Sequence, residues 1–258
     1  MMGKTVLVTG AGSGFGKGVA LGLARCGHNV IAGAQIWPQV TELRNAAELE
    51  GVRLTVIKLD VLDAIDRQRV FQHEIDVLLN NAGIMQAGPV AEIPIALVRQ
   101  VFETNVFAAL ELAQGFARQM IRRGSGKIVW TSSVAGLVKV PWVAAYAASK
   151  HAVEALCASM REELKPYGVQ VATVNPGAYR TGFNDTGMES MDQWWEDGKQ
   201  VMQPRVKRPL NNQHDPQEMI DAIIDVITAA SHPYRTVRPQ SAAEMVRREQ
   251  ADEWDVIV

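Results

Sequence analysis

The chain has 258 residues, of which 47% are hydrophobic, and its formal net charge is −2. This composition predicts a globular protein with a substantial core, without the basic surface of a nucleic-acid-binding protein or the roughly 18 consecutive apolar residues of a membrane span. With only Cys26 and Cys157 and five scattered histidines, we expect no disulfide, no metal site and a cytoplasmic location.

Short β-branched runs alternate with longer amphipathic segments along the chain. Strands are predicted at 4–10, 29–34, 52–61, 75–83, 126–133, 169–177 and 234–239. Helices are predicted at 15–27, 38–50, 64–73, 94–123, 142–168 and 216–230, followed by a weak helix in the tail. Such alternation forms βαβ units, and the nearly all-apolar strands favour a parallel sheet that is covered on both faces. No linker or repeat divides residues 1–258, so one domain is expected, with an irregular segment at 178–214.

A glycine-rich turn, TGAGSGFG, joins the first strand to the first helix at residues 9–16. Gly10, Gly14 and Gly16 remove Cβ atoms where the backbone turns tightly and approaches a ligand. The helix that follows presents free N–H groups and a positive dipole end, which suit a pyrophosphate. The turn alone is a weak signal, because it also fits a purely structural role, but its place after a first strand favours dinucleotide binding.

Five further motifs follow this loop in a fixed order: NNAG (80–83), Asn105, TSS (131–133), YAASK (146–150) and NPG (175–177). Together, over residues 9 to 181, they resemble the short-chain dehydrogenase/reductase family. The resemblance implies an α/β fold with a single Rossmann-type doubly wound sheet of about seven mainly parallel strands, flanked by helices. It also implies an NAD- or NADP-dependent oxidoreductase. Between Asp60 and Asn80 the chain is shorter than is common in the family, which leaves the length of one outer helix open.

The family resemblance implies four catalytic residues. Tyr146 matches the acid/base, Lys150 its partner, and Ser133 the residue that holds the substrate oxygen. Asn105 matches an asparagine at a local bend of a helix, where a bound water relays protons to Lys150. A free tyrosine has a pKa of about 10, and positions i and i+4 share one helix face, so we expect Lys150 to lower the pKa of Tyr146.

The resemblance also implies a set of residues that contact the cofactor. They are Gly10, Ser13, Gly14, Phe15, Gly16, Ala34, Gln35, Asp60, Val61, Asn81, Ala82, Gly83, Tyr146, Lys150, Pro176, Gly177 and Thr181. An acid at the end of the second strand would favour NAD, but Ala34 stands there. We therefore expect NADP, although Gln35 and Ser13 occupy positions where the family often has a cation.

The segment 178–214 matches the substrate lid of the family. Its apolar residues and those before Tyr146 favour a hydrophobic secondary alcohol or ketone: Phe183, Met188, Met191, Trp194, Trp195, Leu137, Val138, Val140 and Trp142. Three cations of the segment, Arg205, Lys207 and Arg208, are expected on a solvated surface.

The helices at 94–123 and 142–167 are subunit interfaces by resemblance, so a homodimer or homotetramer is expected. Two other functions stay open. One is a non-catalytic NAD(P)-binding redox sensor, and the other is an isomerase or dehydratase that retains its nicotinamide.

Overall fold

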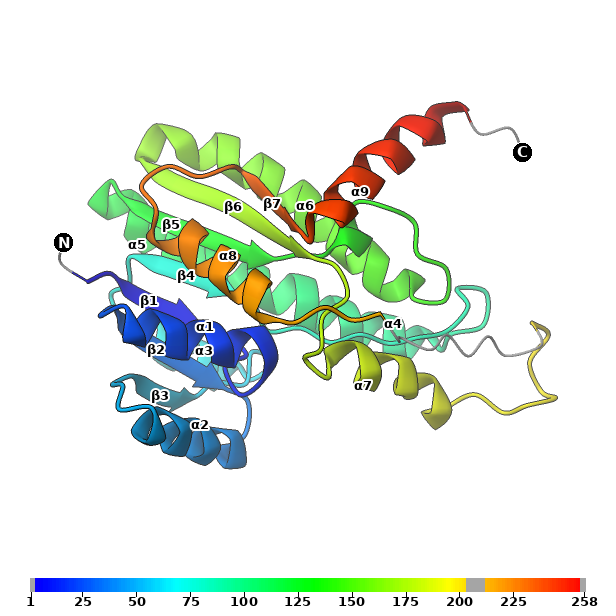
Figure 1. Ribbon diagram of the computed structural model, residues 1–258, viewed down its shortest axis with the longest axis horizontal. Coiled ribbons are helices and arrows are strands. Elements are labelled where there is room, and N and C mark those ends of the chain that lie inside the picture. The colour runs from blue at the N-terminus through cyan, green and yellow to red at the C-terminus, as the bar shows by residue number, and fades with distance from the viewer. Residues whose placement is uncertain (1–2, 203–211, 256–258) are drawn as a thin grey trace.

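The computed structural model describes residues 3–202 and 212–255. Within these residues seven strands form one parallel sheet in the order β3-β2-β1-β4-β5-β6-β7 (Figure 1). The strands are β1 (Thr5–Val8), β2 (Asn29–Ala34), β3 (Thr55–Lys58), β4 (Val77–Asn80), β5 (Gly126–Thr131), β6 (Val169–Pro176) and β7 (Arg235–Arg238). The predicted doubly wound fold is confirmed. The winding direction reverses between β1 and β4, which is where such sheets bind ligands.

Helices cover both faces of the sheet (Figure 1). They are α1 (Gly14–Arg25), α2 (Trp37–Leu49), α3 (Ala64–Val70), α4 (Ile95–Phe102), α5 (Ala109–Arg123), α6 (Ala144–Leu164), α7 (Phe183–Glu189), α8 (Gln217–Thr228) and α9 (Gln240–Asp252). Gly27, with φ of +80°, follows the end of α1 as predicted, because the left-handed conformation suits glycine. None of the helices in the described part of the chain is long and apolar enough to cross a bilayer.

The predicted helical region at 94–123 is found, and the local bend expected at Asn105 is a π-helical turn at Glu103–Ala108 between α4 and α5. Two expectations about the helices need correction. The segment 178–214 is not irregular throughout, since it contains α7 and a 3₁₀ turn at Ser190–Gln193. The tail helix α9 is a full helix of 13 residues. Within the same segment, Arg205, Lys207 and Arg208 lie outside the described residues.

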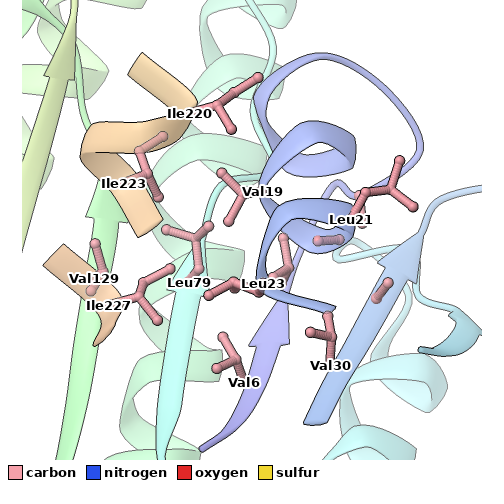
Figure 2. Close-up of a cluster of buried hydrophobic side chains, with 14 of the residues drawn as sticks. Val6, Val19, Leu21, Leu23, Val30, Leu79, Val129, Ile220, Ile223 and Ile227 are labelled. Atoms are coloured by element: carbon pink, nitrogen blue, oxygen red, sulfur yellow. The ribbon is translucent and has the colours of Figure 1, made fainter. Parts of the chain in front are cut away.

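One half of the core lies between the sheet and the helices α1, α2 and α8. Figure 2 shows Val6, Leu79 and Val129 projecting from neighbouring strands towards α1 and α8. Side chains of the two helices, among them Leu23 and Ile223, close over them. Burial of this kind supplies most of the free energy that holds a doubly wound sheet together.

The other half of the core lies under α3, α5 and α6. The short α3 leads into Phe71, whose ring packs edge-on against Phe116 of α5 at 5.2 Å between centroids. Gly115 makes this approach possible, because a Cβ atom there would lie 2.1 Å from Cε1 of Phe71. This aromatic contact holds the region of the short helix α3 against α5. The contact does not involve the residues at the carboxyl ends of the strands.

The carboxyl end of α8 is capped by two lysines. The buried Lys127 of β5 donates from Nζ to the carbonyls of Val226 and Ala229 at 2.6 and 2.8 Å. Lys4 donates to the carbonyls of the two residues between them, each at 2.9 Å. The last carbonyls of a helix have no partner within the helix, so these ammonium groups satisfy them and complement the helix dipole.

Candidate active site

The glycine-rich loop fits closely against the chain segment that follows β4. Gly10 has φ of +64°, and a Cβ there would lie 2.8 Å from Cα of Ala82. At Gly16 a Cβ would lie 2.3 Å from the carbonyl oxygen of Gly10. Neither position has room for a side chain, so the two glycines keep the loop low over the end of the sheet. The N-terminal N–H groups of α1 begin directly after it, at Gly14.

Thr9, the last residue before this loop, joins it to the neighbouring segment. Its hydroxyl donates to the carbonyl of Leu79 at 3.3 Å and accepts from the backbone N–H groups of Asn81 and Ala82 at 2.9 and 3.0 Å. The Asn81 amide returns a hydrogen bond to the Thr9 carbonyl at 3.0 Å. The ends of β1 and β4 are therefore held as one unit at the switch point of the sheet.

A cleft of about 560 Å³ opens at the carboxyl ends of the strands. This volume lies in the range of small-molecule and cofactor sites. Most predicted cofactor residues line it: Gly10, Ser13, Gly14, Phe15, Gln35, Asp60, Val61, Asn81, Ala82, Gly83, Tyr146, Lys150, Pro176, Gly177 and Thr181. Gly16, Ala34 and Asn105 do not line the cleft and support its walls from behind. The glycine cradle, the helix N-terminus and the cleft together fit a dinucleotide.

Tyr146 and Lys150 lie on the same wall of this cleft. Both belong to α6 and both are buried, and Nζ of Lys150 lies 5.6 Å from the centroid of the Tyr146 ring. Nζ also donates to the carbonyl of Thr131, at the end of β5, at 2.7 Å. The i, i+4 spacing on one helix thus brings the ammonium beside the phenol, as predicted.

The charge states of this pair differ from the expectation. Burial raises the pKa of Tyr146 to about 12. A hydrogen bond with the Ser133 hydroxyl lowers this pKa by a smaller amount. Burial also lowers the pKa of Lys150 to about 8. In the protein without cofactor the Tyr146 pKa is therefore raised, not lowered as expected, because loss of solvent is the largest influence on it. At neutral pH the phenol holds its proton and can act as a donor.

Asn105 lies in the π-helical turn and is 2% exposed. Its Oδ1 accepts from the backbone N–H of Ile84 at 2.8 Å, and its Nδ2 donates to the Ile84 carbonyl at 2.9 Å and to Oγ of Ser149 at 3.0 Å. The Ser149 hydroxyl in turn donates to the carbonyl of Tyr146 at 2.7 Å. The amide therefore connects the segment after β4 to the helix that carries the tyrosine.

Ser133 follows β5 and starts a 3₁₀ turn. Its hydroxyl accepts from the backbone N–H of Ala135 at 3.1 Å and donates to the carbonyl of Pro176 at 3.4 Å. Both Ser133 and Ser132 line the cleft, together with Tyr146. The serine selected from sequence spacing is thus placed next to the phenol, with a long and replaceable hydrogen bond to Pro176.

The far end of the cleft carries amides where the family often has charges. Gln35 and Gln39 line this end, and Oε1 of Gln39 accepts from the backbone N–H of Gln35 at 3.1 Å. Gly12 leaves room for the Gln39 side chain, since a Cβ there would lie 2.6 Å from it. Among the described residues that line the cleft, Asp60 and Lys150 carry charge. Within the described ranges, no cluster of three or more metal-ligating side chains occurs.

The lid contributes less apolar wall than predicted. Phe183 of α7 lines the cleft and packs on the Tyr146 ring at 5.7 Å between centroids. The other candidates turn away from the cleft: Met188, Met191, Trp194, Trp195, Val140 and Trp142 pack together, and Leu137 and Val138 pack with residues of α9. These side chains are therefore corrected from pocket walls to packing residues.

Sequence reasoning missed several residues that support the site. Thr9 and Ser149 belong to quoted motifs, TG and YAASK, so the motifs could have suggested them. Asn175 likewise belongs to the quoted motif NPG, whereas Gln39 and Glu154 lie outside every motif and carry no such signal.

Comparisons with known proteins bear on this arrangement. A family model described as short chain dehydrogenase matches residues 4–192. The chain is 32% identical over 239 residues to the oxidoreductase YusZ of Bacillus subtilis, covering 87% of this chain and 85% of the relative. It is 38% identical over 190 residues to the oxidoreductase YbbO of Escherichia coli K12, covering 72% and 69%. Human 17-beta-hydroxysteroid dehydrogenase type 1 is 32% identical over 206 residues, covering 75% of this chain and 62% of that protein.

Solved structures share the whole architecture. A short-chain dehydrogenase/reductase from Burkholderia phymatum, in complex with NAD, superposes with a TM-score of 0.83 at 23% identity, covering 98% of this chain and 94% of that chain. This similarity is one of fold. A variant of the actinorhodin polyketide ketoreductase, with NADPH, superposes with a TM-score of 0.77 at 25% identity, covering 91% and 95%.

Proposed function

This chain belongs to the short-chain dehydrogenase family and is an oxidoreductase, and we propose that it interconverts a ketone and a secondary alcohol with a nicotinamide dinucleotide. The observation that carries the proposal is the shared cleft. It holds Tyr146, Lys150 and Ser133 at one end and the glycine cradle at the other. A non-catalytic sensor would not need an acid, its cationic partner and a hydroxyl side by side.

The proposed mechanism assigns the proton to the chain and the hydride to the cofactor. In ketone reduction Tyr146 donates its phenolic proton to the substrate oxygen, which the Ser133 hydroxyl holds by a hydrogen bond. The ammonium of Lys150 stabilises the phenolate that remains. When bound, the nicotinamide supplies hydride in reduction and accepts it in oxidation. Alcohol oxidation uses the same groups in reverse, so it requires the deprotonated phenol and is favoured at higher pH.

Asn105 is assigned the role of holding the route by which a proton returns, through Lys150, to the Tyr146 phenolate. Its position in a π-helical turn supports this role, because such turns leave backbone carbonyls without the usual helical partner. Its amide fixes Ile84 and Ser149 on either side of that turn. Loss of the amide is expected to slow proton return rather than to abolish binding.

We assign NADP as the preferred cofactor. Gly10, Gly14 and Gly16 would cradle the pyrophosphate, and Asp60 would meet the adenine. Ala34 at the end of β2 carries no charge, which leaves Asp60 as the one carboxylate among the described cleft residues, and the amides of Gln35 and Gln39 can donate hydrogen bonds to a phosphate. Lys150 would hold the nicotinamide ribose.

The proposed substrate is a hydrophobic alcohol or ketone. Phe183 and Ile84 line the cleft beside Tyr146 and supply apolar surface there. One relative is a 17-beta-hydroxysteroid dehydrogenase by name, which is consistent with this class. We also propose that the protein is a homodimer or homotetramer. A cytoplasmic location is part of the proposal too, and the free thiols of Cys26 and Cys157 are consistent with it.

The proposal is tested first with Tyr146→Phe. We expect kcat for reduction of a panel of cyclic and aromatic ketones with NADPH to fall by about 10²–10⁴-fold, because the proton donor is lost. The dissociation constant for NADPH, measured by fluorescence, should stay within about twofold, since phenylalanine keeps the ring. Tyr167→Phe, which removes the hydroxyl of an exposed tyrosine, is the matched control and should leave kcat unchanged. Turnover that survives Tyr146→Phe would remove the assigned acid.

A further inference from the structure

A buried carboxylate lies one helical turn beyond Lys150 on α6. Glu154 is 7% exposed and does not line the cleft. Its Oε2 accepts two hydrogen bonds from the guanidinium of Arg235 on β7, from Nη2 at 2.7 Å and from Nε at 3.2 Å. The Arg235 side chain is 38% exposed, so this ion pair is only half-buried, and pairs that reach solvent contribute little stability.

The other oxygen of this carboxylate, Oε1, is connected to the backbone of Ser133 through the side-chain amide of Asn175. Nδ2 of the fully buried Asn175 donates to Oε1 of Glu154 at 2.6 Å and to the carbonyl of Ser133 at 3.1 Å. The carboxylate accepts only, so it fixes the amide of Asn175 with its nitrogen towards Ser133. A reversed amide would put its oxygen against both acceptors. The chain Arg235–Glu154–Asn175 therefore ends on the residue that holds the substrate oxygen.

The same carboxylate acts on the charge of Lys150. The ammonium is 5% exposed, and burial lowers its pKa to about 8, while the negative charges that Glu154 and Cys157 can carry act in the raising direction. Burial also raises the pKa of the Cys157 thiol well above its usual value, so at neutral pH the thiol is uncharged and Glu154 is the effective anion.

Within the described residues, the other elements packed around Lys150 present no further anion. Thr131 of β5 offers a carbonyl, and Asn105 of the π-helical turn lies behind Gly83 with a neutral amide. Tyr146 presents its ring, and its burial keeps the phenol neutral. Arg235 reaches Glu154 from β7 and partly compensates its charge.

We propose that Glu154 is a positioning residue of the active site, which holds Ser133 in place through Asn175 and keeps Lys150 in its ammonium form. This inference rests on the proposed function, in which Lys150 must be charged to stabilise the phenolate. Glu154 itself touches neither substrate nor cofactor.

The first test is Glu154→Gln, which removes the charge and retains an oxygen that can accept from Asn175. The pKa of Lys150, followed by NMR of ¹³C-labelled lysine in the protein without cofactor, should fall by about one unit. The upper limb of the pH profile of kcat/KM for ketone reduction should move down by the same amount. A side chain that only stabilised the fold would change the melting temperature and leave both quantities in place.

The matched control is Glu162→Gln on the same helix. Glu162 makes an exposed ion pair with Arg161 at 3.2 Å, so this variant removes the same charge and the same kind of contact away from the site. Neither the pKa of Lys150 nor the upper limb of the pH profile of kcat/KM should shift in this variant. Asn175→Ala separates the two halves of the proposal, since it cuts the link to Ser133 and leaves the carboxylate. It should lower kcat by about tenfold without shifting the upper limb of the pH profile of kcat/KM.

Glu154→Gln leaves Arg235 without its partner and could fail to fold. The double variant Glu154→Gln/Arg235→Gln removes both charges and should show a smaller downward shift of the Lys150 pKa, because the compensating cation is lost as well. A folded single or double variant with an unshifted Lys150 titration would overturn the proposal. Absence of turnover in the unaltered protein with every ketone would instead count against the proposed function, while the NMR titration would still report on Glu154.

Discussion

At the scale of single residues, burial governs the chemistry of the cleft. Removal from solvent raises the pKa of Tyr146 to about 12 and lowers that of Lys150 to about 8, so both groups are moved towards their neutral forms. The sequence identifies both side chains and their spacing, since i and i+4 positions on a helix meet. It does not reveal the direction of the Tyr146 shift, because that depends on how completely Phe183 and the walls exclude water.

Cofactor preference also belongs to single residues, and Gln35 tests it. Gln35→Arg places a cation at the end of the cleft where the amides of Gln35 and Gln39 lie. We expect the dissociation constant for NADPH to fall by about tenfold, which corresponds to about 1.4 kcal/mol, and that for NADH to change little. Fluorescence titration with the two cofactors side by side measures this. Gln72→Arg, an exposed position at the end of α3, is the control. Equal tightening of both cofactors would argue against a phosphate at this place.

At the scale of elements, the alternation of strands and helices was predictable, but local interruptions were not. The apolar runs mark the inner strands because these are buried on both faces, whereas the edge strands β3 and β7 are only partly buried. The helix α7 was missed because Gly187 and Asn184 are poor helix formers. Gly187 is there for tertiary reasons, since a Cβ would lie 2.2 Å from Cε of Met85. The predicted Trp194 and Trp195 walls failed similarly, because composition does not show which way a side chain points.

The cap of α8 provides a test at this scale. Lys127→Met removes a buried donor and leaves the carbonyls of Val226 and Ala229 unsatisfied, so we expect the free energy of unfolding to fall by about 2 kcal/mol. Lys4→Met should cost clearly less, because Lys4 is half-buried and water can replace it. Urea unfolding of the two variants measures the difference. Equal losses would show that burial of the Lys127 site does not matter.

At the scale of the whole molecule, the long helical segment from α4 to α5 leaves apolar side chains facing outward. Phe107, in the π-helical turn between α4 and α5, is 53% exposed, and Ile95 at the start of α4 is 61% exposed. The two side chains lie about three turns apart on this helical segment, and exposed apolar surface on one side of a protein is typical of subunit contacts.

We therefore expect sedimentation to show a dimer or tetramer that Phe107→Glu converts to a smaller species, because a carboxylate cannot be buried there without a partner. Leu49→Glu alters an exposed apolar residue at the end of α2 and should leave the mass unchanged. An unaltered mass in the Phe107 variant would place the interface elsewhere.

The hydroxyl of Thr9 has a further consequence. It ties the glycine turn to the segment after β4, so the part of the cleft proposed to bind the diphosphate and the part proposed to transfer the proton are anchored to one set of hydrogen bonds between β1 and β4. Gln35 and Gln39 lie beyond these hydrogen bonds, on a rim that none of them reaches. Surface substitutions at this rim can therefore change the preference between NAD and NADP, while the residues around Tyr146 keep their geometry.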